Sequence, residues 1–440
     1  MGDGTLPETD RRTWLAGALS LGMAVPNVAW SRQTTPLPPR GMPAHADDEG
    51  FWRQVRKQFL IPDNIVFMNP GTAGSSPRPV LDAVYAGFEN TEEMDDLPSD
   101  EYPIWGYKKS WDEFRRPLAE FLGCGVDQLA LLRNTTEGNN AVAAGLRLDR
   151  GDEVILSNEE HRSLEQPWLQ RAARDGVVVR RFEMPRAPES ADAILDRIEA
   201  AITPRTRLIF VSHVTSPTGV VLPVRAIAAL ARARGVLSAF DGAQVPGMLA
   251  LDIESIGCDI YTGSLHKWLH APKGTGFLYV RDSALDRLWV TITTGGWDDP
   301  AIKAERFQHI GTSNLPLLWG MRASIDFTNR IGMDRIEARQ RALADYLLDQ
   351  MVARGAESWT SPDPALRGAM ATVDIAPLER MPFQDWLWRE RRVRIRGSDP
   401  SRVRLCTPYF LSRGDCDRFL EAFDDYRGLN RARLGRTPRA

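Results

Sequence analysis

The segment 261–267 (YTGSLHK) carries the residue types whose spacing most directly suggests chemistry. An apolar, β-branched run predicts a buried strand over 258–262, and the small residues that follow predict a turn. The turn leads to Lys267, which lies among apolar and aromatic residues, where an ammonium ion is costly to bury. Lys267 is therefore either a lysine whose charged end reaches water or one whose neutral amine forms a Schiff base with a carbonyl compound.

A second segment, 236–247 (VLSAFDGAQVPG), places a carboxylate in apolar surroundings. Its pattern predicts a buried strand that ends at Asp241 and a loop that contains Gln244. Such a carboxylate needs a cation or several donors, and a protonated pyridine nitrogen is a suitable cation. Asp241 would then hold pyridoxal 5'-phosphate (PLP) as the pyridinium that stabilises carbanions, and Gln244 would donate to the phenolic oxygen of the ring. The alternative is that Asp241 caps a helix that begins at Ala243.

Together the two segments resemble the class V family of fold-type I PLP-dependent aminotransferases, and in particular its isopenicillin N epimerase-like branch. The similarity extends over residues 67–410, with several motifs in the family's order. The resemblance implies that PLP is the cofactor, that Lys267 is its covalent attachment point and the general base, and that Asp241 is the partner of the ring nitrogen.

A hydroxyl-rich turn follows the predicted strand 128–132 and opens a helix. The free N–H groups at a helix N-terminus favour a phosphate, so Thr135 and Thr136 are candidate phosphate ligands. The alternative is a capping motif completed by Glu137, which needs no ligand. The position of this turn relative to the other motifs matches the family's phosphate-binding turn and favours the first interpretation.

The resemblance assigns further residues to the cofactor. Ser264 and His266 would bind the phosphate, and Thr312 would reach the phosphate of a neighbouring subunit, which implies a homodimer with shared active sites. His161 would stack on the PLP ring and assist proton transfer, although a lone histidine is often only structural. Ser216 stands where other branches have an asparagine near the phenolic oxygen, so its hydrogen bond would be weaker.

Three residues are expected to bind the substrate. Arg404 matches the family's carboxylate-binding arginine and would form a bidentate contact with an amino-acid carboxylate; the alternative is a surface arginine at a strand edge. Asn69 and Gly71 belong to a Gly-rich loop that leads into the substrate pocket in this family.

The reaction class follows from removal of the α-proton from a Schiff base of the substrate amine, which makes the chain an aminotransferase- or epimerase-type enzyme. β-Elimination, as in a C–S lyase, stays open, and so does a protein of this fold that binds a partner without turnover. Desulfurases of this class use a loop cysteine before the C-terminal domain, and no cysteine lies between Cys258 and Cys406. The acid that would protonate the second face of the carbanion has four candidates, namely Tyr102, Tyr107, His213 and Tyr409.

Predicted strands and helices alternate from residue 129 to 280, which indicates an α/β fold with a mainly parallel, seven-stranded sheet covered by helices. A smaller α+β C-terminal domain should begin with one long helix over 317–354. The expected divisions are a signal peptide and linker over 1–46, an N-terminal segment that joins the small domain over 47–78, the large PLP-binding domain over 79–316, the small domain over 317–430 and a tail over 431–440.

The N-terminus matches a twin-arginine export signal. Arg11 and Arg12 precede a weakly apolar run over 14–25 that is too short to span a bilayer, and an A-x-A site predicts cleavage after Ala46. The mature protein is therefore expected in the periplasm, without other membrane association. Export points towards a periplasmic relative of the kind that modifies a side chain during maturation of pyoverdine siderophores, with an amino acid or a siderophore peptide as substrate.

Composition and charge exclude some partners. The formal net charge of −3 and the absence of a long Lys/Arg run argue against nucleic acid. The four cysteines are widely spaced and form no metal-binding pattern. In the periplasm Cys406 and Cys416 would either pair or remain two buried thiols.

Overall fold

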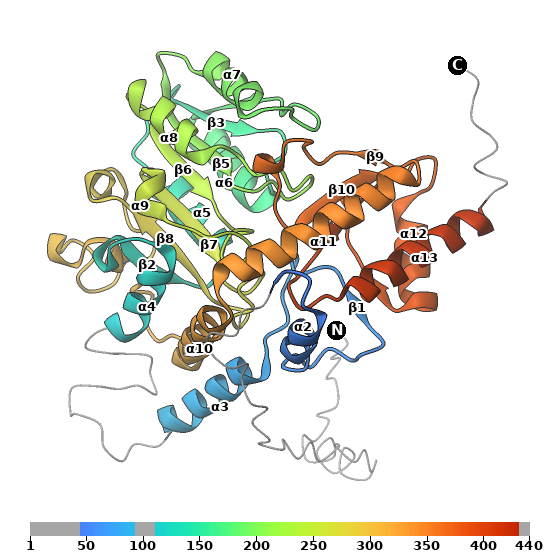
Figure 1. Ribbon diagram of the computed structural model, residues 1–440. Helices are drawn as coiled ribbons and strands as arrows, with labels where there is room; N and C mark the ends of the chain where they lie inside the picture. The colour runs from blue at the N-terminus through green and yellow to red at the C-terminus, as the bar shows by residue number, and fades with distance from the viewer. Residues whose placement is uncertain (1–44, 93–110, 431–440) are drawn as a thin grey trace, which may run out of the picture. The chain divides into compact units, whose positions relative to one another are not determined.

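The computed structural model describes residues 45–92 and 111–430 (Figure 1). The predicted signal peptide, except for its last two residues, lies outside the described residues, as do Tyr102, Tyr107 and the tail 431–440. Within the described ranges, no helix combines the length and apolar character needed to cross a membrane.

A seven-stranded sheet with the order β2-β8-β7-β6-β5-β3-β4 forms the centre of the large domain (Figure 1). Only β8 is antiparallel to its neighbours, and the other pairs are parallel. This confirms the predicted mainly parallel sheet, although the strand before the lysine continues through Ser264 instead of ending at residue 262. The strands are β2 (Leu129–Leu132), β3 (Glu153–Ser157), β4 (Val178–Phe182), β5 (Thr206–Ser212), β6 (Leu237–Asp241), β7 (Ile260–Ser264) and β8 (Gly276–Val280).

The alternation of side chains along each strand creates an apolar core on each face of the sheet. In β5, Leu208 and Phe210 belong to one core, whereas Ile209 and Val211 belong to the other. Because both faces must be covered, the central strands are largely apolar, as expected for a parallel sheet, whereas the edge strand β4 contains Arg180 and Arg181. The first core is completed by α5 (Thr135–Gly145) and α6 (Arg162–Asp175), and the second by α4 (Asp112–Leu122), α7 (Ala191–Ala201), α8 (Val224–Ala233) and the short α9 (Ile253–Ile256).

The small domain contains a three-stranded antiparallel sheet with the order β12-β10-β9. The N-terminal segment reaches this domain through a parallel pairing of β1 with β11. The prediction of one helix over 317–354 was wrong: the chain forms two helices, separated at Gly332, whose φ of 97° a non-glycine residue rarely adopts. The elements are α2 (Glu49–Arg56), β1 (Val66–Phe67), α3 (Arg78–Glu92), α10 (Leu315–Ile331), α11 (Met333–Ala353), β9 (Glu357–Ser358), β10 (Met370–Asp374), α12 (Arg380–Trp386), β11 (Val393–Arg394), β12 (Arg402–Cys406) and α13 (Arg413–Leu429).

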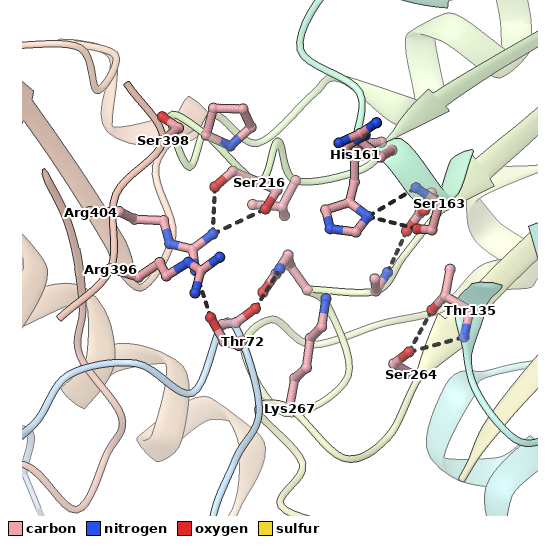
Figure 2. Close-up of a pocket in the computed structure, with 18 of the residues that line it drawn as sticks. Thr72, Thr135, His161, Ser163, Ser216, Ser264, Lys267, Arg396, Ser398 and Arg404 are labelled. Carbon is pink, nitrogen blue, oxygen red and sulfur yellow. Dashed lines mark hydrogen bonds between the residues drawn. The ribbon is translucent and has the colours of Figure 1, made fainter. Parts of the chain in front are cut away.

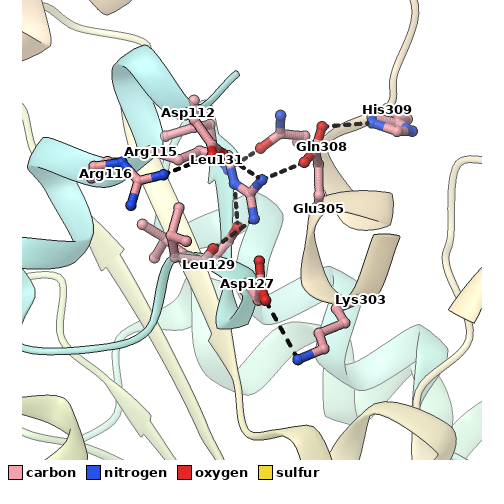
Figure 3. Close-up of polar contacts among 11 residues, drawn as sticks. Asp112, Arg115, Arg116, Asp127, Leu129, Leu131, Lys303, Glu305, Gln308 and His309 are labelled. Atoms are coloured by element: carbon pink, nitrogen blue, oxygen red, sulfur yellow. Dashed lines mark hydrogen bonds and ion pairs between the residues drawn. The ribbon is translucent and has the colours of Figure 1, made fainter. Parts of the chain in front are cut away.

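A polar cluster around Arg115 ties the 3₁₀ segment Pro300–Gln308 to the edge of the sheet (Figure 3). The buried guanidinium donates to the carbonyl oxygens of Leu129 at 3.1 Å and Val126 at 2.6 Å, and it forms an ion pair with Glu305. The cluster therefore holds the 3₁₀ segment in place, and the chain continues from this segment to Thr312.

Candidate active site

One cavity lies where the carboxyl ends of the parallel strands meet residues of the small domain (Figure 2). Ligand sites of open α/β sheets are expected at this edge. The cavity gathers residues that are far apart in the sequence, including most of those predicted from motifs. The predicted residues that line it are Gly71, Thr135, Thr136, His161, Ser216, Asp241, Gln244, Ser264, His266, Lys267 and Arg404.

Lys267 follows β7 and faces the cavity with a half-buried side chain. Burial is the main cause that lowers the pKa of its ammonium group to about 8; the charge of Asp241 opposes this shift, and that of Arg404 contributes to it. A substantial share of the amine is therefore neutral near pH 8, which a lysine nucleophile or general base requires.

Asp241 is buried at the end of β6. Its carboxylate accepts hydrogen bonds from Asn139 Nδ2 at 2.8 Å and from the backbone N–H of Ala243 at 2.9 Å, while Thr262 Oγ1 donates to Asn139 Oδ1 at 2.8 Å. No helix begins at Ala243, so the helix-cap alternative was wrong. Within the part of the chain that the structure describes, no cationic side chain forms an ion pair with this carboxylate. A buried carboxylate of this kind suits a cationic ligand nitrogen.

The side chain of Gln244 is fixed by two hydrogen bonds. Its Nε2 donates to the carbonyl oxygen of Gly71 at 3.0 Å, and its Oε1 accepts from Trp268 Nε1 at 2.8 Å. One N–H of the carboxamide is left for a ligand in the cavity. The packing around Gly71 is close, because a Cβ atom there would lie 3.2 Å from Cys406 Sγ and 3.3 Å from Arg404 Nη2.

The N-terminus of α5 presents polar groups at one end of the cavity. Ser264 Oγ accepts from the backbone N–H of Thr135 at 3.0 Å and lies 2.8 Å from Thr135 Oγ1. Asn134 caps the helix by accepting from the N–H of Glu137 at 3.0 Å, so capping and a ligand site coexist here. His266 Nδ1 is buried and has no hydrogen-bond partner among the described residues. An anion bound at this helix N-terminus would supply an acceptor for these polar groups.

His161 is the N-cap residue of α6, and its ring faces the cavity (Figure 2). Nδ1 accepts from the backbone N–H of Ser163 at 3.2 Å and lies 2.7 Å from Ser163 Oγ. Burial and the positive charge of Lys267 lower the pKa of the imidazole. The ring is therefore neutral at pH 7, as a stacking partner for an aromatic ligand should be.

Arg404 is buried in β12, and its guanidinium lacks a carboxylate partner among the residues with described positions. Nη1 donates to the backbone oxygen of Ser216 at 2.7 Å and to its Oγ at 3.0 Å, and Nη2 reaches Thr72 Oγ1 at 3.4 Å. The buried Nε has no hydrogen-bond partner among the described residues. This arrangement positions an unneutralised guanidinium for an anionic ligand, and it ties Ser216 to Arg404 rather than leaving its hydroxyl free.

Two predicted site residues lie outside the cavity. Asn69 does not line the cavity. Its Oδ1 accepts from Thr72 Oγ1 at 2.8 Å, and Thr72 lines the cavity. The prediction that Asn69 lines the pocket is corrected accordingly. Thr312 is exposed on the segment before α10 and does not line the cavity of its own chain; its role towards a neighbouring subunit stays a prediction.

The candidate acids His213 and Tyr409 are buried away from the cavity. His213 Nδ1 lies 2.7 Å from the hydroxyl of Tyr261, and neither His213 nor Tyr409 contributes to the cavity lining, so neither is placed to protonate a substrate. Cys406 and Cys416 are free thiols.

Glu160 is a cavity residue that the motifs did not identify. One carboxyl oxygen accepts from Ser157 Oγ at 2.6 Å and the other from Ser212 Oγ at 2.5 Å. Burial, and to a smaller extent the charge of Asp241, raises the pKa of Glu160 to about 7. Its position directly before His161 was the only sequence signal.

The aminotransferase class V family model matches residues 65–396. The chain belongs to this family. It is 33% identical over 401 residues to isopenicillin N epimerase of Streptomyces clavuligerus, covering 86% of this chain and 98% of the relative. The enzyme of the same name from Amycolatopsis lactamdurans is 32% identical, with 85% and 98% covered. A probable cysteine desulfurase of Methanothermobacter thermautotrophicus is 31% identical, with 67% and 74% covered.

Solved structures agree with this assignment. A cysteine desulfurase of Escherichia coli shares the fold, with a TM-score of 0.74 at 22% identity and coverage of 86% and 98%. A lysine-to-alanine variant of C-DES, with glycine covalently linked to its PLP, has a TM-score of 0.72 at 25% identity, with 84% and 99% covered. The chain is thus a PLP-dependent enzyme of the class V family, and PLP is its cofactor.

The cavity residues fit PLP. Asp241 offers the ring nitrogen a buried carboxylate that has no cationic partner among the described residues. The α5 N-terminus and the buried Nδ1 of His266 offer polar groups for the phosphate. Lys267 offers an amine of lowered pKa for covalent attachment. When bound, PLP supplies the electron sink that stabilises negative charge at the substrate α-carbon.

Proposed function

We propose that the protein acts on an amino acid, or on a peptide that carries a free amino-acid group, by removing its α-proton and then completing an epimerisation or a transamination. One observation carries this proposal: Lys267, Asp241 and the unneutralised Arg404 face the same cavity. Relatives named isopenicillin N epimerase align along 98% of their length, which supports the choice of reaction class.

The roles follow from the positions. Arg404 binds the α-carboxylate and so orients the α-carbon. Lys267 Nζ takes the α-proton, because a neutral amine with a pKa near the working pH is an effective general base. Asp241, held by Asn139, keeps a proton on the ring nitrogen. His161 covers the ring and limits its movement.

Exchange of the α-hydrogen in D₂O tests this function. The holoenzyme should remove the α-proton signal of at least one member of a panel of L-amino acids and acidic dipeptides, as followed by NMR. Appearance of the D-enantiomer identifies an epimerase, and appearance of the oxo acid identifies an aminotransferase. Lys267→Ala should abolish exchange, whereas Lys273→Ala, an exposed lysine of the same segment, should not. Absence of exchange across the panel contradicts the proposal.

A C–S lyase activity is the second candidate, because the structural relative C-DES is described as a cystine C–S lyase and is 24% identical. The described lining of the cavity contains no cysteine, which argues against a persulfide on the enzyme itself. Release of pyruvate from L-cystine by the holoenzyme would favour this reaction, and its absence, with α-exchange present, would exclude it.

We infer that the enzyme is a homodimer in which Thr312 binds the cofactor phosphate of the other subunit. Thr312→Ala and Lys267→Ala variants are each expected to be impaired. A mixture, refolded together, should regain about a quarter of wild-type activity, because half of the dimers are hybrids and each hybrid has one intact site. If Thr312 served its own subunit, mixing would restore nothing.

We also propose export to the periplasm through the twin-arginine pathway, with a siderophore peptide as one substrate class to test. The support is the Arg11-Arg12 pair followed by an apolar run and the A-x-A site before Asp47. Cell fractionation should find a mature chain that starts at Asp47, and replacing both arginines with lysine should retain the precursor in the cytoplasm. A periplasmic product from the double variant, or a cytoplasmic wild type, contradicts export.

A further inference from the structure

Two arginines, Arg396 and Arg404, lie next to each other at the small-domain side of the cavity (Figure 2). Arg396 and Arg404 are partners in an antiparallel bridge, and the N–H of Arg404 donates to the carbonyl oxygen of Arg396 at 2.7 Å. Residues paired in this way project to the same side of a sheet, and like charges there are destabilising. The pair therefore suits an anion between or beside the two guanidinium groups.

Arg380, the first residue of α12, is a third arginine at this side of the cavity. Its Nε donates to the carbonyl oxygen of Asp399 at 2.9 Å, which fixes the side chain. Burial, and then the charge of Arg396, lower the pKa of Arg380. Gly397 permits the close packing, because a Cβ atom there would lie 2.2 Å from Arg380 Cδ and 2.0 Å from the carbonyl oxygen of Arg402.

These three cavity arginines form no ion pair with a carboxylate within the described ranges, whereas two other arginines of the same domain do. Arg402 pairs with Asp399, and Arg391 pairs with Asp425 at 2.7 Å. The cavity therefore gathers three guanidinium groups that have no carboxylate partner among the described residues.

One guanidinium, that of Arg404, is sufficient for an α-carboxylate. The phosphate of PLP does not explain the other two, because its candidate ligands Thr135 and Ser264 lie on the other side of Lys267 (Figure 2). Two cationic groups remain for a second negative group of the substrate.

We propose that Arg380 and Arg396 form a second anion subsite, which binds a side-chain carboxylate of the substrate while Arg404 binds the α-carboxylate. The enzyme would then select acidic amino acids, or peptides that end in one, over neutral amino acids of the same length. This inference deepens the proposed function and rests on it for the orientation of the substrate.

Isothermal titration calorimetry of the holoenzyme with glutarate and with pentanoate tests the subsite without any chemistry at an amine. The two probes have the same chain length and differ in the second carboxylate. The wild type should bind glutarate at least tenfold more tightly than pentanoate, since hydrogen bonds to charged groups are strong. Arg396→Gln and Arg380→Gln should each lower this preference about tenfold, and both effects should weaken at high salt.

Arg389→Gln is the matched control, because Arg389 is exposed on the same domain and does not line the cavity; it should keep the wild-type preference. Arg396 is also exposed, so its replacement should preserve the fold even if Arg380→Gln does not. Equal affinities in the wild type, or an unchanged preference in Arg396→Gln, would overturn the subsite. Failure of α-hydrogen exchange would instead contradict the proposed function and leave the calorimetric result standing.

Discussion

Asn139 Nδ2 donates to Asp241 Oδ2 at 2.8 Å, although the two residues are 102 positions apart in the sequence. Both side chains are buried, and Thr262 fixes the other end of the Asn139 carboxamide. The carboxylate that we expect to bind the ring nitrogen of PLP is therefore held in one orientation by a helix residue that carries no recognisable motif.

We predict that Asn139→Ala slows α-proton removal about tenfold, which corresponds to about 1.4 kcal/mol, because Asp241 loses a charge-assisted hydrogen bond. Asp241→Ala should slow the same step more strongly. Single-turnover kinetics with α-deuterated substrate will measure the step. The neighbouring Asn140→Ala is the control, since Asn140 is exposed and its Nδ2 donates to the Thr136 carbonyl oxygen instead of Asp241; an equal effect in both asparagine variants would contradict the account.

The rate of covalent PLP attachment to the apoprotein should depend on pH through Lys267. Its pKa of about 8 means that the neutral amine increases about tenfold between pH 7 and 9 and then levels off. Asp241 raises this pKa, so Asp241→Asn should move the plateau to lower pH. Stopped-flow absorbance will record the rates. If the attachment rate continued to rise steeply above pH 9, as expected for a free lysine, the surroundings of Lys267 would not lower its pKa.

Arg404→Gln should raise KM for α-amino acids at least tenfold, because the substrate loses a charge-assisted contact. It should leave the reaction with primary amines that lack a carboxylate unchanged. Comparing kcat/KM for an amino acid and its decarboxylated amine separates these effects. A parallel loss for both substrates would mean that Arg404 supports the fold or the cofactor instead.

Arg115→Ala should lower the free energy of unfolding by about 3 kcal/mol, since it leaves buried carbonyl groups and Glu305 without their partner. Arg116→Ala should cost less than about 1 kcal/mol, because Arg116 is exposed and its ion pair with Asp112 lies at the surface. Urea denaturation of both variants measures the difference. Similar losses would show that the buried cluster does not hold the segment Pro300–Gln308 in place.

The sequence alone was enough to predict the sheet and the residues that follow its strands. Lys267, Asp241 and Thr135 each stand within a few residues of an apolar run that becomes a buried strand, so local pattern and motif coincide. Because parallel strands align their carboxyl ends, these residues were expected to meet.

Features that depend on tertiary packing were not predictable. Arg380 and Arg396 are two of many arginines, and only the fold brings them to the cavity. Gly332 interrupts an apolar pattern that continues on both sides, so its backbone conformation was invisible to periodicity. Asn69 belongs to a Gly-rich loop that was expected to line the substrate pocket, but its side chain bonds to the hydroxyl of Thr72, which lines the cavity in its place.

Borohydride reduction of the purified holoenzyme, followed by peptide mapping, tests the central claim most directly. The account predicts a yellow wild-type protein whose reduced cofactor is attached to the peptide that contains Lys267, and a Lys267→Ala variant without covalent cofactor. Attachment at another lysine, or a colourless wild type that does not take up added PLP, would contradict the account.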